Sequence, residues 1–441
     1  MAPATEQLYT AEEMRAAEAG HDVDSMMQRA GAAVAEEVMR RFPDARRIAV
    51  YAGGGANGGD GKIAGERLLL EGRDLVEERP DVIVDALLGT GMKGAPRDET
   101  ARAIDEINSA GVPVVAVDIP SGVNASTGEV AGAAVRADVT VTMHGRKVGL
   151  AVAPGRFFAG EVVVADIGLE TGETANALVT PAILDEVPRR SPGDNKYTSG
   201  HVLVVGGSPG MTGAAALAAR AAFRADAGYV TICAPAESVP VLEVLVTEAV
   251  KRPLEQVDEA ASRAGALALG PGLGREPEVK ALVRRLLAEV ALPAVVDADA
   301  LFELEPGDWP APRVLTPHAG ELGRLLGRES KEIASHRLAS VREAAEKFDA
   351  VVVLKGEDSL VAAPGGGVLV CALGLPSLAT AGTGDVLTGI TAAFLAKGMA
   401  PQRAAAAACA AQQLASRAAE QRAGLVASDV VEALPSVLAG R

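Results

Sequence analysis

The chain has 441 residues, 49% of them hydrophobic and 23% charged, a globular composition that excludes a fibrous or disordered protein. This length predicts two domains, because a single hydrophobic core rarely serves so many residues. The formal net charge of -16 excludes the basic surface that nucleic-acid phosphates require, so an anionic ligand has to be held locally by backbone N–H groups.

The start of the chain leads us to expect a cytoplasmic protein. Its first twenty residues mix acidic and polar side chains and lack the basic start and apolar core of a secretory signal. No apolar stretch is long enough to span a bilayer. Cys233, Cys371 and Cys409 form no CxxC pair, and we interpret them as buried structural thiols in a reducing compartment.

Residues 1–170 are predicted to form an α/β domain. An amphipathic helical stretch runs from about Glu12 to Arg41, and β-branched runs then alternate with helical stretches. This alternation is typical of a parallel sheet with crossover helices. The runs are IAVY at Ile48, VIVDA at Val82, VPVVAVD at Val112, ADVTVT at Ala137 and EVVVAD at Glu161.

Residues 171–199 are rich in proline, glycine and polar residues, and we interpret them as the connection between two domains. A second α/β domain is predicted over 200–441, where an Ala-rich helix is expected from Arg403 to Ala419. Most of its β-runs end in Gly, Asp or His, and ligands bind beyond the carboxyl ends of parallel strands. These runs are HVLVVGG at His201, YVTICAP at Tyr229, ALALGPG at Ala266, AVVDADA at Ala294, RVLTPHAGE at Arg313 and VVVLKGED at Val351.

A glycine-rich loop follows the first β-run. The sequence IAVYAGGGANGGDG places Gly53, Gly54, Gly55, Gly58, Gly59 and Gly61 between a strand and a helix that is expected to begin near Lys62. Such a loop brings bare backbone amides close to a phosphate. It does not follow the GxGxxG pattern with an acidic residue at Rossmann spacing, so taken alone it also fits a plain turn.

The next strand ends carry polar residues. Asp85 precedes a second glycine loop, Gly89 to Gly94, and VDIPSG carries Asp118 and Ser121. Three side chains offer oxygen donors suited to a hard cation: Asn57, Asp85 and Ser121. Asp118 is a candidate proton shuttle. Each carboxylate alone would more often cap a helix or a turn. Their convergence at one sheet edge favours a site.

Four motifs in order, AGGGANGGDG, VDALLGTG, VDIPSGVNASTG and DVTVTMHGRKVGL, resemble the YjeF N-terminal domain, the NAD(P)H-hydrate epimerase family, from Tyr9 to about Leu169. The resemblance implies a Rossmann-like three-layer αβα fold that binds potassium through Asn57, Asp85 and Ser121. It also implies that Asp118 contacts the substrate, and we assign acid/base work to it. The implied substrate-binding residues are Ala56, Asn57, Gly58, Gly59, Asp60, Gly89, Thr90, Gly91, Met92, Lys93, Gly94, Ala95 and Asp118.

The sequence departs from that family in two places. Ala56 stands where the family usually has the first of two asparagines. Only EGRDLVEERPD, residues 71–81, separates the first helix of the sheet from VDALLGTG, where the family has a strand and a helix. A shortened domain is therefore expected. Two alternatives stay open: a working epimerase with a shortened sheet, and a binding or scaffold module.

The sequence LPSLATAGTGDVLTGITAAFLAKG is the strongest single signal in the chain. Gly382, Thr383 and Gly384 precede Asp385 and an apolar helix, so amides at the helix N-terminus form an anion hole beside a carboxylate. A capping aspartate would not need the flanking glycines. The loop resembles that of ribokinase-like phosphotransferases, which implies that Asp385 deprotonates a hydroxyl while the amides stabilise the transferring phosphoryl group.

The remaining motifs, KYTSGHVLVVGGSPGMTGAA, LALGPGLG, VVDADAL, LTPHAGEL and VVLKGEDS, resemble the YjeF C-terminal family of ADP- or ATP-dependent NAD(P)H-hydrate dehydratases from about Asp194 to Leu434. The resemblance implies a ribokinase-like αβα domain. The implied substrate contacts are Ala214, Gly272, His318 and Asp385, and the implied nucleotide contacts are Lys355, Gly356, Glu357, Asp358, Ser359 and Gly384. Thr316, Pro317 and Glu321 make the match around His318 specific.

The two resemblances together imply a bifunctional repair enzyme for hydrated NADH and NADPH. Phosphorylation of the C6 hydroxyl makes a better leaving group, Asp385 acts as the base, and the ring nitrogen lone pair expels phosphate. ADP or ATP is the implied co-substrate, with Mg²⁺ beside it, and K⁺ is implied for the epimerase site. We expect small-molecule partners only, with no nucleic acid and no membrane, and a homo-oligomer.

One rival interpretation stays open for the second domain. The motifs TPHAGE and GTGD do not exclude a small-molecule kinase of the ribokinase superfamily, such as a hydroxymethylpyrimidine or hydroxyethylthiazole kinase, which would release a stable phosphorylated product. The fused first domain argues against this rival.

Overall fold

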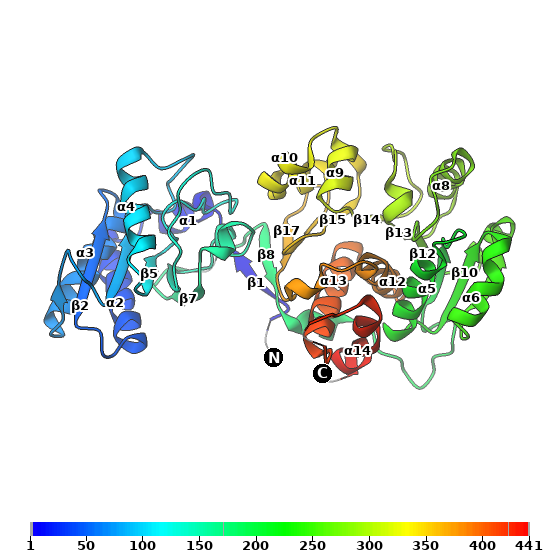
Figure 1. Cartoon of the computed structure of the whole chain (residues 1–441), viewed down its shortest axis with the longest axis horizontal. Helices are drawn as coiled ribbons and strands as arrows, with labels where there is room; N and C mark the ends of the chain where they lie inside the picture. Colours follow the sequence, from blue (N-terminus) through cyan, green and yellow to red (C-terminus); the bar gives the residue numbers. More distant parts are fainter. Residues whose placement is uncertain (1–2, 171, 422, 440–441) are drawn as a thin grey trace. The chain divides into compact units, whose positions relative to one another are not determined.

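The computed structural model describes residues 3–170, 172–421 and 423–439 (Figure 1). The chain divides into two compact units. Residues Gln7–Asn176 form the N-terminal unit, and the described residues up to Glu6 join those from Ala177 onwards in the C-terminal unit.

The N-terminal unit is built on a six-stranded parallel sheet with the order β3-β2-β4-β5-β6-β7. All five β-runs predicted for this part of the sequence are strands. Its helices and strands are α1 (Ala11–Glu18), α2 (Val23–Arg41), β2 (Arg47–Ala52), α3 (Ala56–Leu70), β3 (Asp74–Leu75), β4 (Val82–Ala86), α4 (Asp98–Ser109), β5 (Val114–Val117), β6 (Val139–Met143) and β7 (Glu161–Ala165).

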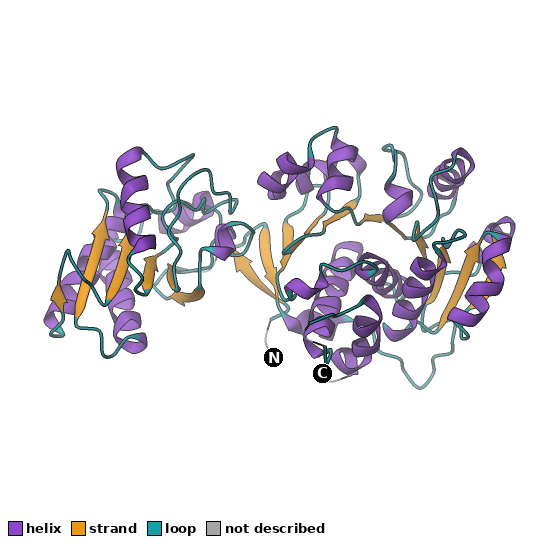
Figure 2. Cartoon of the chain, in the orientation of Figure 1, coloured by secondary structure: helices purple, strands orange, loops and turns teal. Residues whose placement is uncertain are grey.

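Alternating side chains give this sheet two apolar faces. Ile48 and Val82 belong to the buried cluster that includes residues of α2 and α3. Their neighbours Ala49 and Ile83 belong to a second cluster with Ile104 of α4. Because successive side chains of a strand point to opposite faces, one sheet is covered on both sides, and the unit has three layers (Figure 2).

Two helix boundaries differ from the prediction. The helix expected to begin near Lys62 begins at Ala56, so Gly58, Gly59 and Gly61 lie inside α3. Glycine is required there by packing, since a Cβ at Gly58 would collide with the carbonyl oxygen of Gly53. The stretch predicted as one helix from Glu12 to Arg41 is broken between α1 and α2, where Gly20 has a φ of +85°.

The edge of the sheet is short, as the sequence led us to expect. Strand β3 has two residues and pairs only through Arg47 with Asp74 and Ile48 with Leu75. Within the described residues no helix lies between β3 and β4. Leu70 and Leu75 are consequently exposed at this edge.

The C-terminal unit contains most of an eleven-stranded sheet with the order β1-β8-β17-β16-β15-β14-β13-β12-β9-β10-β11. The strands from β15 to β11 in this order are parallel, and β16 is antiparallel to both of its neighbours. The strands are β1 (Thr5–Leu8), β8 (Asn176–Val179), β9 (His201–Val205), β10 (Tyr229–Ala234), β11 (Val250–Pro253), β12 (Ala266–Leu269), β13 (Ala294–Val296), β14 (Arg313–Leu315), β15 (Val351–Leu354), β16 (Ser359–Ala362) and β17 (Val368–Cys371).

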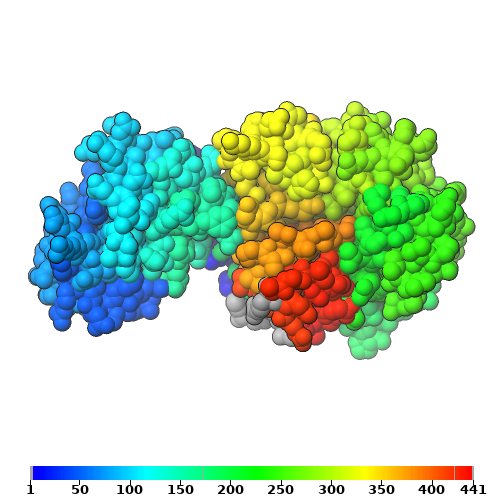
Figure 3. Space-filling view, viewed as in Figure 1, coloured from blue at the N-terminus to red at the C-terminus, as the bar shows by residue number. Residues whose placement is uncertain are grey.

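Helices pack against this sheet, and α12 lies at the centre of one layer. It contacts α5, α13 and α14 as well as β9, β12 and β13, while α11 packs on β15 and β16. In Figure 3 the segment of α9 to α11 is yellow and α14 is red. The helices are α5 (Thr212–Arg224), α6 (Val239–Leu245), α7 (Val257–Ala261), α8 (Pro277–Glu289), α9 (Ala319–Leu326), α10 (Ser330–Ser335), α11 (Arg337–Phe348), α12 (Thr383–Ala396), α13 (Pro401–Ala418) and α14 (Ala427–Ala439).

The segment predicted as a connection, residues 171–199, contains regular structure. Strand β8 pairs with β17, and a 3-10 helix spans Pro181–Glu186. Strand β8 lies between β1 and β17 in the sheet, and its four residues are too short a run to stand out in the sequence. Thr171, the first residue of the predicted connection, lies outside the described residues.

The prediction that the cysteines are buried thiols is confirmed. Cys233, Cys371 and Cys409 are free and buried. No helix in the described ranges is both long enough and apolar enough to cross a membrane.

Candidate active sites

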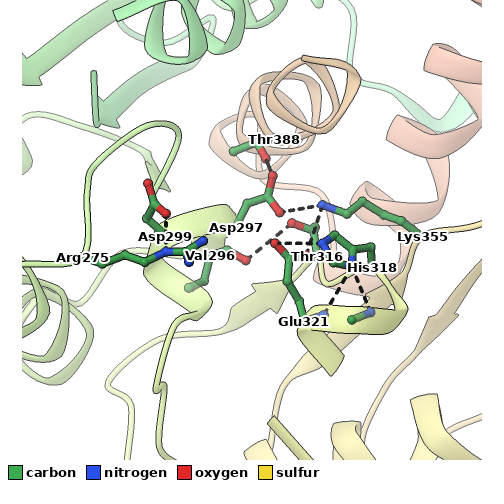
Figure 4. Close-up of polar contacts among 10 residues, drawn as sticks. Arg275, Val296, Asp297, Asp299, Thr316, His318, Glu321, Lys355 and Thr388 are labelled. Atoms are coloured by element: carbon green, nitrogen blue, oxygen red, sulfur yellow. Dashed lines mark hydrogen bonds and ion pairs between the residues drawn. The ribbon is translucent and has the colours of Figure 1, made fainter. Parts of the chain in front are cut away.

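In the C-terminal unit, an ion pair joins the ends of two parallel strands. Asp297 follows β13 and Lys355 follows β15, and Asp297 Oδ1 lies 2.8 Å from Lys355 Nζ. The hydroxyl of Thr388, on α12, donates to Asp297 Oδ2 at 2.8 Å (Figure 4). Glu321 adds a second carboxylate, 3.9 Å from Lys355 Nζ. An ammonium group is thus held at the carboxyl edge of the sheet, where ligands bind.

Burial and pairing set the charges of this pair. Burial disfavours the ammonium form of Lys355, but the carboxylates of Asp297 and Glu321 outweigh it, and its pKa is raised. Burial also disfavours the Asp297 carboxylate, but Lys355 and hydroxyl donors outweigh it, and its pKa is lowered. Both groups are therefore charged near neutral pH.

Asp385 lies in the first turn of α12. Burial raises the pKa of Asp385 to about 7, with the negative charge of Asp297 adding to the effect and Lys355 opposing it. A carboxyl group with a pKa near the working pH suits a general base. Gly382 precedes the helix with a φ of +88°. The structure therefore places Asp385 next to free backbone amides and an ammonium group.

Gly384 lies beside the paired charges of Lys355 and Asp297. A Cβ there would lie 3.4 Å from Lys355 Nζ and 3.5 Å from Asp297 Oδ2. Ala214 and Gly272 lie next to each other at another point of the same sheet edge, since a Cβ at Gly272 would lie 3.2 Å from the Ala214 Cβ. These positions keep the backbone accessible to a ligand.

His318 is a helix cap. Its Nδ1 accepts hydrogen bonds from the backbone N–H groups of Gly320, at 2.9 Å, and Glu321, at 3.3 Å, while a Glu321 carboxylate oxygen accepts from His318 N at 2.8 Å. The His318 side chain is 57% exposed, and its Nε2 lies 3.6 Å from Glu321 Oε1. The cap fixes the ring orientation.

The predicted nucleotide segment from Lys355 to Ser359 divides into two parts. Lys355 faces the site described above. Asp358 is buried, and its Oδ1 lies 2.6 Å from Arg337 Nη2, which also donates to the Asp358 carbonyl oxygen. Ser359 is the buried first residue of β16. The carboxylate of Asp358 therefore neutralises a buried guanidinium, and we expect it to position the segment.

Sequence reasoning gave no role to Asp297 or Thr388. Asp297 stands directly after β13 in VVDADAL, the position that marked the other strand ends, so the signal was present. Thr388 lies one turn after Asp385 on α12, and only the fold shows that it donates to Asp297. Asp299, two residues after Asp297, accepts hydrogen bonds from Gly274 N and from Arg275 Nε.

The N-terminal unit contains a cavity of about 590 Å³. Its wall is formed by residues of α1, α2 and α3 and by the loops that follow β2, β4 and β5. The lining residues are Glu18, Val23, Met26, Met27, Ala30, Gly54, Gly55, Ala56, Asn57, Asp60, Leu87, Leu88, Gly89, Thr90, Gly91, Met92, Asp118, Met143 and Ile167.

The structure brings eight of the predicted substrate-binding residues to this cavity: Ala56, Asn57, Asp60, Gly89, Thr90, Gly91, Met92 and Asp118. Five others, Gly58, Gly59, Lys93, Gly94 and Ala95, are not among its lining residues. A Cβ at Gly59 would lie 2.7 Å from Met27 Sδ, so Gly59 faces α2.

Asp118 is held by a buried lysine. The ammonium group of Lys147, which is 0% exposed, donates to Asp118 Oδ1. The same oxygen accepts from Met143 N at 3.0 Å and Thr142 Oγ1 at 3.2 Å. Asp118 has a φ of +64°, a strained conformation for a residue other than glycine. Sequence reasoning gave no role to Lys147, although it lies in the motif DVTVTMHGRKVGL.

Asp85, Ser121 and Asn57 meet at the ends of β4, β5 and β2. Asp85 is fully buried, and it accepts from Ser121 N at 2.8 Å and Ser121 Oγ at 2.6 Å. Asn57 Nδ2 donates to the carbonyl oxygen of Leu88, whose N–H donates to Ser121 Oγ. Burial raises the pKa of Asp85 to about 6. A buried carboxylate among neutral oxygens is a donor set that fits a hard cation.

Two further carboxyl groups face this cavity. Burial raises the pKa of Asp60 to about 7, and the charges of Asp118 and Glu18 act in the same direction. Burial likewise raises the pKa of Glu18, with Asp118 adding to the effect. Asp60 was predicted only as part of the substrate-binding loop, and Glu18 had no predicted role.

Family models match both units. The model described as NAD(P)H-hydrate dehydratase matches residues 202–436, and the model described as YjeF-related protein N-terminus matches residues 23–77 and 70–149. The two stretches that match the YjeF-related model overlap at residues 70–77, where the short strand β3 lies.

Curated relatives match nearly the whole chain. The chain is 38% identical to "Bifunctional NAD(P)H-hydrate repair enzyme Nnr" of Moorella thermoacetica, over 94% of this chain and 92% of the relative. It is 33% identical to the protein of the same name from Escherichia coli, over 94% and 89%. The first alignment spans 488 positions, which exceeds the 441 residues of this chain, so the relative has segments that this chain lacks.

Solved structures match the C-terminal unit. The ADP/ATP-dependent NAD(P)H-hydrate dehydratase of Bacillus subtilis, co-crystallised with ATP and Mg²⁺, is 30% identical, with a TM-score of 0.54 and coverage of 59% of this chain and 97% of that one. A ribokinase-like superfamily protein of Enterococcus faecalis is 23% identical, with a TM-score of 0.55 and coverage of 62% and 98%. The second match supports the fold alone.

Proposed function

This chain belongs to the family of bifunctional NAD(P)H-hydrate repair enzymes, and from that premise we propose how its residues divide the work. The N-terminal unit is an NAD(P)H-hydrate epimerase, and the C-terminal unit is an ADP/ATP-dependent NAD(P)H-hydrate dehydratase. One observation carries the assignment of the second reaction: Asp385, with a pKa raised by burial to about 7, lies at the start of α12 beside the paired ammonium group of Lys355.

The dehydratase site performs a phosphoryl transfer followed by an elimination. Asp385 removes the proton of the C6 hydroxyl as its oxygen attacks the terminal phosphoryl group of the nucleotide. The amides at the start of α12 and the ammonium group of Lys355 stabilise the charge on that phosphoryl group. The lone pair of the ring nitrogen then expels inorganic phosphate and forms a C6=N⁺ iminium. Loss of a proton from C5 to solvent restores the C5=C6 double bond of NADH or NADPH.

Nucleotide and substrate contacts are assigned as follows. Lys355 and Gly384 contact the phosphates of ADP or ATP, and the segment Gly356 to Ser359 supports them. Ala214, Gly272, His318 and Asp385 contact the hydrated dinucleotide. Asp297 and Asp299, near Asp385, have carboxylate oxygens of the kind that Mg²⁺ prefers and would hold a Mg²⁺ bound with the nucleotide, which would offset phosphate charge.

In the epimerase site, Asn57, Asp85 and Ser121 would hold K⁺. Support comes from the donor set, in which the buried Asp85 carboxylate is surrounded by oxygen atoms and amide groups. K⁺ would supply positive charge near the glycine loop, where the dinucleotide phosphates bind. Asp118 would contact the nicotinamide ring. A cytoplasmic location and a homo-oligomeric state stay predictions.

The test uses the purified protein with the S epimer of hydrated NADH and either ADP or ATP. We expect the absorbance of reduced nicotinamide to return, with one inorganic phosphate released for each NADH. A stable phosphorylated product without return of that absorbance would instead identify a small-molecule kinase. Parallel assays with hydrated NADPH give the substrate preference.

A further inference from the structure

Three carboxyl groups from three different elements face the cavity of the N-terminal unit. Glu18 comes from α1, Asp60 from α3, and Asp118 from the end of β5. The buried ammonium group of Lys147 is bound to one of them, Asp118. Carboxyl groups that share a cavity cannot all be ionised at little cost, so a cation bound to one of them favours a proton on the others.

Asp118 is the carboxyl group that binds this ammonium group. Within the described residues its carboxyl group accepts three hydrogen bonds, from Lys147 Nζ, Thr142 Oγ1 and Met143 N, and all three go to Oδ1. Lys147 is itself fixed, since it also donates to Met143 O at 2.7 Å and to Thr142 Oγ1 at 3.1 Å. Oδ2 takes part in none of these bonds. One oxygen thus anchors the carboxyl group while the other is left for a ligand in the cavity.

Asp60 is placed in the opposite way. In the described part of the chain its carboxyl group accepts no hydrogen bond, and it faces the negative charges of Glu18 and Asp118. Helix α2, which packs on α3, presents Met26 and Met27 to the cavity, and neither titrates. Asp85, within β4, accepts a hydrogen bond from Ser121 Oγ. Burial is the main reason that the pKa of Asp60 is raised to about 7, and the negative charges of Asp118 and Glu18 add to it. The positive charge of Lys147 has the opposite effect.

At one substrate cavity, a carboxyl group that an ammonium group binds and a second carboxyl group whose surroundings favour its protonated form make an acid and base pair. We propose that Asp60 is a second catalytic residue of the epimerase, which protonates the departing C6 hydroxyl while Asp118 deprotonates the water that adds to the other face of the ring. The inference rests on the proposed function of this unit as an epimerase. Lys147 is the positioning residue that holds Asp118 Oδ1.

The step balances in atoms and charge. The C6–O bond breaks as Asp60 gives its proton to the hydroxyl, which leaves as water, and the nitrogen lone pair forms a C=N⁺ bond. A second water attacks C6 from the opposite face, the electron pair returns to nitrogen, and Asp118 takes the proton. The net change is inversion at C6. One proton then passes from Asp118 to Asp60 through solvent to restore the enzyme.

The experiment follows loss of the purified R epimer without nucleotide, over pH values on both sides of 7, with the uncatalysed rate subtracted. Asp60→Asn should slow epimerisation by about 10²–10⁴-fold, the usual contribution of a general acid. Asp60→Glu should restore a large part of the rate. Glu66→Gln, an exposed substitution on the same helix, is the matched control and should leave the rate unchanged.

The Glu18→Gln variant tests the protonation state. Asp60 acts in its protonated form, so the wild-type rate falls as pH rises through the pKa of Asp60. Removing the negative charge of Glu18 lowers that pKa, and the alkaline limb of the profile should move to lower pH. If Asp60 has only a structural role, the alkaline limb of the Glu18→Gln profile should coincide with that of the wild type.

Water labelled with ¹⁸O provides an independent readout. The proposed step places one solvent oxygen on C6 for each inversion. Wild-type epimerisation that keeps the original oxygen, or an Asp60→Asn variant with wild-type rate, would overturn the proposal. A wild type that does not accelerate epimerisation at all would instead contradict the proposed function of the unit, so the two failures are distinguishable.

Discussion

Lys355 Nζ lies 2.8 Å from Asp297 Oδ1, so the ammonium group next to Asp385 is already paired with a carboxylate that is 2% exposed. The two residues are 58 positions apart in the sequence. They follow strands β15 and β13, which are separated in the sheet by β14. The pair therefore fixes the distance between two strand ends at the dehydratase site. It also keeps a positive charge in place before the nucleotide binds.

Breaking this pair should destabilise the C-terminal unit as well as the reaction. Lys355→Met leaves Asp297 ionised and buried without its partner, a change that typically costs about 3–5 kcal/mol. We expect a lower unfolding midpoint in denaturant and weaker binding of ADP. In the double variant Lys355→Met with Asp297→Asn, part of the lost stability should return. Equal losses in the single and the double variant would contradict this explanation.

The dehydration rate should depend on the ionisation of Asp385. A base works in its deprotonated form, so the rate should rise with pH through about 7, the raised pKa of this group. Asp385→Asn should reduce dehydration by about 10²–10⁴-fold and leave nucleotide binding nearly unchanged. The measurement is a pH profile of NADH return, with ADP binding as the control. A near wild-type rate in Asp385→Asn would reject this residue as the base.

Gly384→Val should weaken binding of the nucleotide or of the transition state. A Cβ at this position would already lie 3.4 Å from Lys355 Nζ, and the two methyl groups of valine extend into the space that a phosphate would occupy. Titration calorimetry with ADP and steady-state kinetics measure the two effects. Unchanged affinity and turnover would place the anion site elsewhere.

Much of the fold could be predicted from β-branched runs. Every such run that was identified, from Ile48 to Val351, forms a strand, because a strand buried on both faces reads as continuous apolar sequence. The start of α3 at Ala56 could not be predicted, since Gly58, Gly59 and Gly61 locally indicate a loop. They are tolerated in the helix because α3 packs closely on the sheet and on α2.

The two sites were predictable to different degrees. Asp385 and Asp118 were found because each follows a strand or glycine signal within a motif. The position of Asp297 after a strand was visible in the sequence, and Asp60 was predicted in the substrate-binding loop, but their contacts came only from the fold. The fold also buries Lys147 against Asp118 and joins Asp297 to Lys355. Sequence spacing does not specify such contacts, since the partners lie 29 and 58 positions apart.

Asp118→Ala should abolish epimerisation and leave dehydration of the S epimer unchanged. The substitution removes the oxygen that faces the cavity and leaves the Lys147 ammonium buried without this acceptor. The two reactions use separate sheets, so the dehydratase assay is the internal control. If epimerisation persists at the wild-type rate, Asp118 has no catalytic role. Loss of both reactions would show that the variant is not folded.

Potassium should be required for epimerisation alone. Replacing K⁺ by a bulky organic cation should slow loss of the R epimer, because the Asp85 carboxylate then lacks its counter-ion. Asp85→Asn should reduce the response to K⁺ while preserving the bond from Ser121 N to a side-chain oxygen. If the rate at which the wild-type protein consumes the R epimer does not depend on K⁺, the epimerase site does not require this cation.

The most direct test of the account gives the wild-type protein an equal mixture of the R and S epimers of hydrated NADH with excess ADP or ATP. If both units are active, the absorbance of reduced nicotinamide returns in full, with one phosphate released for each NADH, and at a rate above uncatalysed epimerisation. Recovery that stops near half, followed only by the slow uncatalysed rate, would show that the N-terminal unit does not epimerise. Failure to recover any NADH would contradict the function of the whole chain.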